Sequence, residues 1–186
     1  YTAFLQTYLQ LDVYVDPEMV DPQGTRDPEA LSVANYPGLI KKAMRAEFPQ
    51  VSGRSEKRDL YGLVSSGAAF ALRDLVMANP GLVGTTQTLW VPADDDVDML
   101  LKGHIDREQA QGNRRLDDRQ IDWIDELLEA GKLELRFNTT FFTAGDSREP
   151  ELAGIWGAAV GSFYTLVVTL LLSFPIGVAA ALYLEE

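Results

Sequence analysis

Three segments of the chain have the residue pattern of strands. Apolar and polar residues alternate from Thr7 to Asp16, as they do in a strand that is buried on one face. Residues 85–93 and 133–142 are likewise rich in β-branched and aromatic side chains. The pattern therefore predicts about three strands, which lie far apart in the sequence.

Between these strands, apolar residues recur at spacings of three and four, which predicts four to five helices. The helical stretches are residues 35–49, 55–80, 97–103 and 115–131. The second stretch is expected to hold two helices, hinged near Ser65, Ser66 and Gly67. The residues expected on buried helix faces are Leu39, Ile40, Ala43, Met44, Ala69, Leu72, Leu75, Val76, Ile121, Ile124, Leu127 and Leu128.

Turn-forming and acidic residues separate these elements. Residues 16–28 hold Pro, Gly and Asp at short intervals and predict a loop. Asp94, Asp95 and Asp96 are placed to accept hydrogen bonds from the first turn of the helix that follows them. Gly131 is expected to end the last helix of this part. The predicted fold class is an α+β soluble domain with about three strands and four to five helices.

A long apolar segment follows the soluble part. No Lys, Arg, Asp or Glu occurs between Leu152 and Leu184. About 20 apolar helical residues span the hydrocarbon core of a bilayer, so this segment is long enough to cross one with tilt. A buried core helix of this length would need a large partner domain. The expected domains are therefore 1–150, an acidic α+β domain, and 151–186, one transmembrane helix.

The charge of the chain restricts its partners. The net charge is −12, and because Glu185 and Glu186 follow the apolar helix, the soluble part carries −10. Nucleic acid and anionic lipid surfaces are bound through positive charge, so neither is an expected partner of the soluble part. The absence of Cys excludes disulfides and thiolate metal sites. The chain begins without Met or a signal-peptide pattern, so we expect it to belong to a longer protein.

The sequence contains no recognisable catalytic or cofactor motif. His104 is the only histidine, and no nucleophile elbow accompanies it. Asp94, Asp95, Asp96 and Asp98 lack the spacing of an EF-hand, and the Gly-rich nucleotide-binding loops are absent. We therefore expect a non-enzymatic protein with no catalytic, cofactor-binding or metal-ligating residues, in which His104 and the acidic run have surface or capping roles.

Small and hydroxyl residues recur along the apolar helix. Gly157 and Gly161 form a GxxxG pair, a motif at which membrane helices approach each other closely. The candidates for helix packing are Gly157, Gly161, Ser162, Thr165, Thr169 and Ser173. The hydroxyls can alternatively bond to carbonyls of their own helix. Pro175 predicts a kink. A single helix with such a face implies partner helices.

The last 50 positions resemble the membrane-entry region of PstA-type permeases of phosphate ABC transporters. The resemblance rests on TAGDSREPE, a Gly-Ile pair, GSFYT and PIGVAAALYLEE. Upstream, DPQGTRDPEAL, LVSSGAAFALRD and DDDVDMLLKG resemble an extra soluble domain that a proteobacterial subset of these permeases carries near the N-terminus.

The resemblance implies a non-catalytic permease subunit of an ATP-driven phosphate import system in the bacterial inner membrane. The implied partners are a second permease subunit, an ATP-binding subunit and a periplasmic phosphate-binding protein. Residues 1–150 would be periplasmic, with an earlier membrane helix before Tyr1, and 151–186 would begin the ABC permease domain. The loop that grips the ATPase would follow Glu186, so no coupling residue is assigned.

Two arginines are candidates for contact with phosphate. A domain of net charge −10 repels an anion unless Arg or Lys converge locally. Arg136 and Arg148 lie near the membrane entry and are these candidates. The expected role of the soluble domain is docking or assembly. Two alternatives stay open: a periplasmic sensory or assembly ectodomain on a one-helix anchor, and a membrane-anchored hydrolase.

Overall fold

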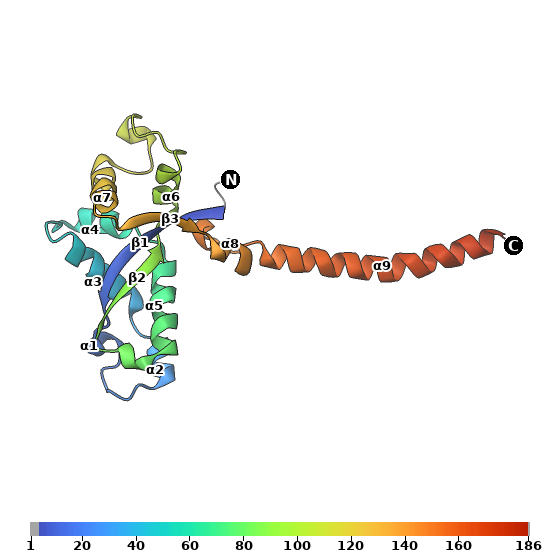
Figure 1. Ribbon diagram of the computed structural model, residues 1–186, viewed down its shortest axis with the longest axis horizontal. Helices are drawn as coiled ribbons and strands as arrows, with labels where there is room; N and C mark the ends of the chain where they lie inside the picture. The colour runs from blue at the N-terminus through green and yellow to red at the C-terminus, as the bar shows by residue number, and fades with distance from the viewer. Residues whose placement is uncertain (1–3, 186) are drawn as a thin grey trace. The chain divides into compact units, whose positions relative to one another are not determined.

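The computed structural model describes residues 4–185 and has two compact units. The sheet unit comprises Tyr1–Phe137, and the helix unit comprises Asn138–Glu186. Helices lie against a small sheet in the first, and the second ends in one long helix (Figure 1). The predicted class is confirmed: an α+β part is followed by one apolar helix that is long enough to cross a membrane.

The sheet is antiparallel, with strand order β2-β1-β3. Its strands are β1 (Leu5–Tyr14), β2 (Thr86–Pro92) and β3 (Leu133–Phe137). The central strand β1 pairs Leu9 with Val91 on one side and with Leu133 on the other. Leu5 pairs with Phe137, so the start of β1 lies beside the end of β3. The three predicted strands, which lie far apart in the sequence, thus meet in one sheet.

The third strand is shorter than its residue pattern predicted. It ends at Phe137, and residues that were expected to extend it form the helix α8 (Thr139–Thr143). The reason is Asn138, whose side-chain oxygen accepts a hydrogen bond from the backbone N–H of Phe141 at 2.9 Å. An Asn cap satisfies a free amide of a first helical turn, and here it outweighs the strand preference of the Thr and Phe residues that follow.

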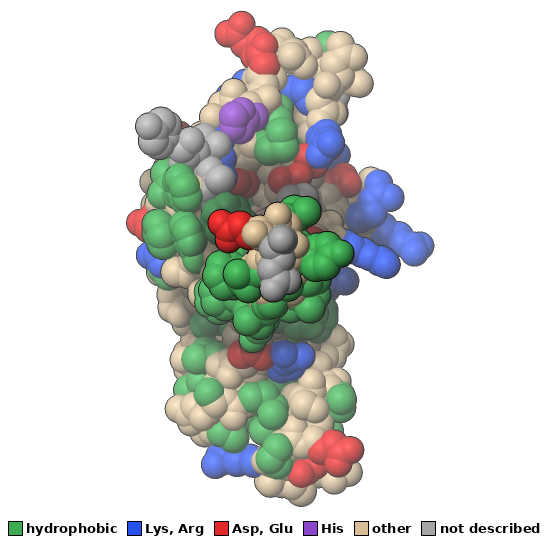
Figure 2. All heavy atoms as spheres, turned by 90° about the vertical axis from the view of Figure 1, so that its right-hand side faces the viewer, with side chains coloured by type: hydrophobic (Ala, Val, Ile, Leu, Met, Phe, Trp, Pro, Cys, Tyr) green, Lys and Arg blue, Asp and Glu red, His purple; other side chains and the backbone are tan. Residues whose placement is uncertain are grey.

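The helix unit ends in α9 (Trp156–Glu185), a helix of 30 residues. At about 1.5 Å per residue such a helix is about 45 Å long, more than the hydrocarbon core of a bilayer. Its most apolar stretch has a mean hydropathy of 2.2, and none of that stretch is buried. Hydrophobic side chains surround the helix (Figure 2). By length and composition, α9 can cross a membrane.

Five of the seven α-helices described in the sheet unit match predicted helical stretches, and the short helices at residues 17–20 and 28–32 were not predicted. The seven are α1 (Pro17–Val20), α2 (Pro28–Ser32), α3 (Tyr36–Glu47), α4 (Arg54–Tyr61), α5 (Gly67–Ala78), α6 (Asp95–Leu101) and α7 (Asp118–Glu129). The predicted hinge separates α4 from α5, and the Asp94 carboxylate caps α6 by accepting from the Asp96 N–H at 3.1 Å. The predicted loop 16–28 additionally contains α1, because Asp16 caps its first turn.

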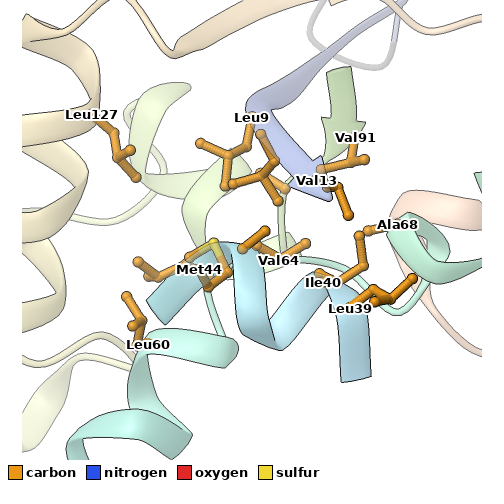
Figure 3. Packing of buried hydrophobic residues seen from close by; sticks show 14 of the residues in the cluster. Leu9, Val13, Leu39, Ile40, Met44, Leu60, Val64, Ala68, Val91 and Leu127 are labelled. Carbon is orange, nitrogen blue, oxygen red and sulfur yellow. The ribbon is translucent and has the colours of Figure 1, made fainter. Parts of the chain in front are cut away.

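The core lies between one face of the sheet and the helices. Alternate residues of β1 are buried, and Leu9 and Val13 point toward Ile40 and Met44 of α3 (Figure 3). All four residues predicted for the inner face of α3 are buried. Burying one such side chain stabilises the fold by about 1.5–3 kcal/mol relative to leaving it exposed. The apolar side chains at alternate positions of β1 therefore form the sheet side of the core.

The buried faces of α5 and α7 differ slightly from the prediction. On α5 the row Ala68, Leu72 and Val76 is buried, because this row at spacing four faces the sheet. The predicted residues Ala69, Leu75 and Leu128 are only partly buried. On α7, Trp123 joins the core, and its ring centroid lies 5.9 Å from that of Phe48. Neither shift changes the fold class.

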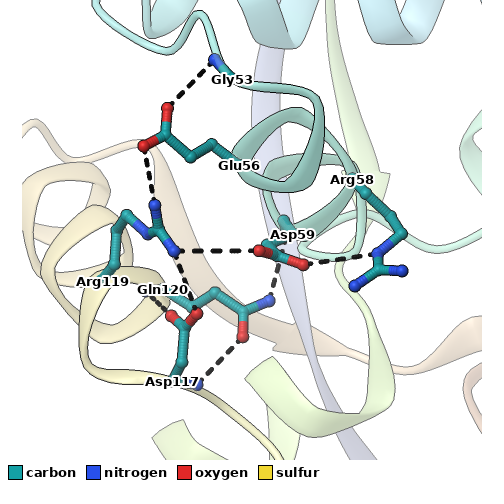
Figure 4. Close-up of polar contacts among 7 residues, drawn as sticks. All are labelled: Gly53, Glu56, Arg58, Asp59, Asp117, Arg119 and Gln120. Carbon is teal, nitrogen blue, oxygen red and sulfur yellow. Dashed lines mark hydrogen bonds and ion pairs between the residues drawn. The ribbon is translucent and has the colours of Figure 1, made fainter.

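A polar network fastens α7 to α4 (Figure 4). The guanidinium of Arg119 lies 2.8 Å from Glu56 and 3.7 Å from Asp117. The side-chain amide of Gln120 donates to the backbone carbonyl of Asp59 at 3.0 Å. Asp117 and Gln120 also form a capping box at the start of α7, so these polar groups have structural roles.

Candidate functional site

The backbone at Gly154, just before α9, lies against the backbone of the segment around α8. The Gly154 N–H donates to the carbonyl of Gly145, and the Ile155 N–H donates to that of Phe141, both at 2.8 Å. A Cβ on Gly154 would lie 2.7 Å from the Thr140 carbonyl oxygen, which is closer than a real side chain permits. The Gly-Ile pair thus holds the end of α8 against the start of α9.

The predicted helix-packing residues lie on the exposed surface of α9. Gly157, Gly161, Ser162, Thr165, Thr169 and Ser173 are all exposed. The Thr165 hydroxyl donates to the Gly161 carbonyl at 2.9 Å, and the Thr169 hydroxyl donates to the Thr165 carbonyl at 2.8 Å. These two hydroxyls are therefore satisfied within the helix. Packing of this row against another helix stays a prediction.

Pro175 lies inside α9, and the helix continues on both sides of it. A proline has no backbone N–H, so the helix lacks the hydrogen bond that this position would donate to the carbonyl four residues earlier. The predicted kink at Pro175 stays a prediction.

The two arginines named as phosphate contacts belong to different units. In the sheet unit, the guanidinium of Arg136 lies over the Trp90 ring at 3.8 Å, and its Nε donates to Glu134 at 3.1 Å. Its positive charge is thus already partly balanced by an aromatic face and a carboxylate. In the helix unit, Arg148 is exposed and makes no ion pair with any described residue. Their contact with phosphate stays a prediction.

The acidic run at 94–98 has local structural partners. The Asp98 carboxylate accepts from the backbone and hydroxyl of Thr7, both at 2.8 Å, and it pairs with Lys102. Among the described residues, no group of three or more His, Asp or Glu is placed to hold a metal ion. His104 is exposed, and its backbone N–H donates to Met99 at 2.9 Å. The Asp98 carboxylate therefore connects α6 to β1, and the backbone N–H of His104 satisfies a carbonyl near the end of α6.

An apolar groove lies between α3 and α5, and the sequence patterns did not predict it. We call it the α3–α5 groove, and its volume is about 520 Å³. Apolar walls are formed by Val33, Tyr36, Ile40, Met44, Ala69 and Phe70. Val33 is 80% exposed and Phe70 is 52% exposed, so large apolar groups stand at an open rim. The sequence signal that could have indicated this groove is Phe70, a large apolar residue on the outer side of a predicted helix.

Two cations flank the walls of this groove. The Lys41 ammonium lies 5.6 Å from the centroid of the Tyr61 ring, and the Arg73 guanidinium lies 5.3 Å from that of Phe70. The Tyr36 hydroxyl donates to the Leu31 carbonyl at 2.8 Å. Burial raises the pKa of the Tyr36 phenol, and the charge of Arg73 opposes this rise only in part. Tyr36 is thus a neutral hydrogen-bond donor in the wall of the groove at neutral pH.

The comparisons with known proteins give one family. The family described as "Domain of unknown function (DUF3333)" matches residues 1–111, which is more than half of the chain. The matched residues include β1, β2 and the helices from α1 to α6, together with both walls of the α3–α5 groove. No curated protein and no solved structure matches the chain.

Proposed function

The chain belongs to the DUF3333 family, and we propose that it is a segment of the membrane-spanning permease of an ATP-driven phosphate import system. The sheet unit serves docking or assembly, and α9 is a membrane-spanning helix of the permease. The phosphate assignment rests on the resemblance of residues 137–186 to PstA-type permeases. Within that segment, the TAGDSREPE stretch is the part that narrows the resemblance to phosphate.

The observation that carries the membrane-spanning part of the proposal is the exposure of α9. Its large apolar side chains lie open along the helix, from Trp156 at 59% to Leu184 at 82%. Exposed apolar surface of this extent is unfavourable in water and marks a membrane or protein contact. An α-helix satisfies its own backbone hydrogen bonds, so it is suited to the hydrocarbon core.

The ends of the sheet unit support its role as an accessory module. Leu5 and Phe137 are paired neighbours in the sheet. Paired Cα atoms of antiparallel strands lie about 5 Å apart, so the chain enters and leaves this unit at nearly one place. Domains with adjacent ends are readily inserted into loops of other proteins. A sheet unit inserted beside α9 would leave the path of the membrane segments unchanged.

The remaining assignments follow from the same resemblance. The protein lies in the bacterial inner membrane with residues 1–150 in the periplasm. Its partners are a second permease subunit, a separate ATP-binding subunit that hydrolyses ATP, and a periplasmic phosphate-binding protein. The chain itself has no catalytic role in this proposal.

A second candidate is a sensory or assembly ectodomain held by a one-helix anchor. The hydrogen bonds of Thr165 and Thr169 to carbonyls of their own helix favour it. Hydroxyls that are satisfied in this way do not require a polar partner helix or a solute pathway.

The test compares phosphate uptake in three strains: one with the intact gene, one without it, and one in which a short Gly-Ser linker replaces residues 5–137. A linker of a few flexible residues spans the gap of about 5 Å between the paired ends. Membrane insertion of each product is verified by its resistance to carbonate extraction. We expect radiolabelled phosphate uptake to be lost without the gene and strongly reduced with the linker.

Each strain tests one part of the proposal. Normal uptake in the strain without the gene would contradict the permease assignment and favour the anchored ectodomain. If the strain without the gene shows no uptake and the linker strain shows normal uptake, the permease assignment stands. The sheet unit would then not be needed to dock a transport partner.

A further inference from the structure

The α3–α5 groove has the features of a protein-docking site. Two walls of a pair of packed helices enclose about 520 Å³, and the apolar groups at the rim, Val33 and Phe70, are 80% and 52% exposed. Small-molecule sites usually enclose most of their ligand. An apolar groove with such an open rim instead fits the side chains of a partner helix, which extends beyond the groove at both ends.

The charges beside the groove specify the partner. Lys41 makes no ion pair with any described residue, and its ammonium is held only near the Tyr61 ring. Arg73 has an exposed ion pair with Asp74 at 2.9 Å, which occupies only part of the guanidinium because that group has five N–H donors. Two available cations flank an apolar surface in a soluble part whose net charge is −10.

A basic depression adjoins the groove. Tyr61 lines both features, and the depression is also lined by Arg54, Lys57 and Arg58. Arg54 and Lys57 make no ion pair with any described residue. Clustered unpaired cations create a positive potential that attracts acidic partners. Positive charge is therefore present on the surface that adjoins the groove at Tyr61.

We propose that the α3–α5 groove binds an acidic amphipathic helix of a partner protein. Apolar side chains of that helix at positions i, i+3, i+4 and i+7 enter the groove between Ile40 and Phe70. Its Asp or Glu side chains face Lys41, Arg73 and the basic depression. This assignment rests on the docking role proposed above for the sheet unit, and it names the surface and the chemistry of the partner.

The test uses the full chain in nanodiscs of phosphatidylcholine and three labelled helical peptides. The first peptide has a Leu face flanked by Glu, the second has Lys in place of every Glu, and the third has the composition of the first in scrambled order. Binding is followed by fluorescence anisotropy. We expect saturable binding of the Glu peptide, and binding of the other two that is at least about tenfold weaker, because complementary charge and apolar spacing are both required.

A charge-swapped variant makes the assignment specific. The double variant Lys41→Glu with Arg73→Glu should weaken the Glu peptide by about tenfold or more and strengthen the Lys peptide, because both rim charges change sign. A gain of binding cannot come from misfolding. The matched control is Arg26→Glu with Arg45→Glu, two exposed cations outside the groove and the basic depression, and it should bind the peptides like the unmodified chain.

Other outcomes would overturn the proposal. Equal binding of the Glu and scrambled peptides, or a double variant without a change of preference, would remove the groove as an acidic-helix site. Self-association of the chain that the double variant abolishes would make a second copy the occupant. Loss of peptide binding when phosphatidylglycerol is added to the nanodiscs would make the lipid surface the occupant. Peptide binding that follows the charge swap would stand even if the uptake experiment failed.

Discussion

The sheet unit and α9 use the same apolar residue types in opposite ways. Leu9 of β1 has no exposed surface, whereas Leu170 of α9 is 62% exposed. In α3 of the sheet unit, Leu39, Ile40 and Met44 are buried on one face, and the charged residues lie on the other. In α9, apolar residues occur on every side. The difference shows that each region is suited to a different solvent: water around the sheet unit and hydrocarbon or other helices around α9.

The comparison also separates two sources of stability. The sheet unit is stabilised by tertiary burial between β1 and the helices, with alternate strand residues carrying the core. The helix α9 has no such burial, so its hydrogen-bonded backbone and its surroundings must stabilise it. Substitutions in the sheet unit should therefore change its free energy of unfolding, whereas substitutions in α9 should change its insertion into a membrane.

The largest effect is expected from Phe48→Ala in the sheet unit. Phe48 is 1% exposed and packs against Trp123. Truncating it leaves a cavity and should lower the free energy of unfolding by about 3–5 kcal/mol. Urea unfolding of the chain in detergent, followed by tryptophan fluorescence, measures the change. Phe70→Ala, at a site that is 52% exposed, is the control and should cost below about 1 kcal/mol. Equal losses would contradict the core assigned to Phe48.

The next effect is expected from Leu170→Arg near the middle of α9. A charged side chain at that depth should raise the free energy of membrane insertion by about 2.5–3.5 kcal/mol. The measurement is the inserted fraction of α9 in a microsomal insertion assay that scores glycosylation of flanking sites. Leu170→Ile should insert like the original helix. If arginine inserts as well as leucine, α9 faces protein or water at this position, and the contrast between the two regions would weaken.

A smaller effect is expected from Gly154→Ala, at the close backbone approach before α9. The added methyl group would lie 2.7 Å from the Thr140 carbonyl oxygen. Displacing that backbone should cost about 1–3 kcal/mol and speed amide hydrogen exchange at Gly154 and Ile155. Gly157→Ala is the matched control, because its Cβ would meet only Gly145 at 3.8 Å. Unchanged exchange in Gly154→Ala would show that this backbone approach does not require glycine.

Local sequence patterns predicted much of the fold, because many elements of the sheet unit are specified by residues close together in the sequence. The alternation in β1, the apolar face of α3 and the Asp94 cap depend on neighbouring residues in the sequence. The end of β3 at Phe137 was missed because strand and cap preferences compete at Asn138. The burial of Trp123 was missed because it depends on Phe48, which is distant in sequence.

The candidate sites were less predictable than the fold. The exposed hydroxyl row of α9 could be located from residue spacing. The hydrogen bonds of Thr165 and Thr169 to their own helix depend on the side-chain rotamers, which spacing does not specify. Arg136 was selected by its charge and position, whereas its contact with Trp90 arises from strand pairing. The α3–α5 groove joins residues from two helices and was missed for the same reason.

The sequence by itself determined the α+β class, the order of most elements and a helix long enough to cross a membrane. These properties follow from periodicity, capping residues and a charge-free apolar run, all of which are local. Only the tertiary structure decided that Leu5 meets Phe137, and that Lys41 and Arg73 lie beside one apolar groove. Such proximities depend on how distant segments pack, and packing is decided by burial across the whole unit.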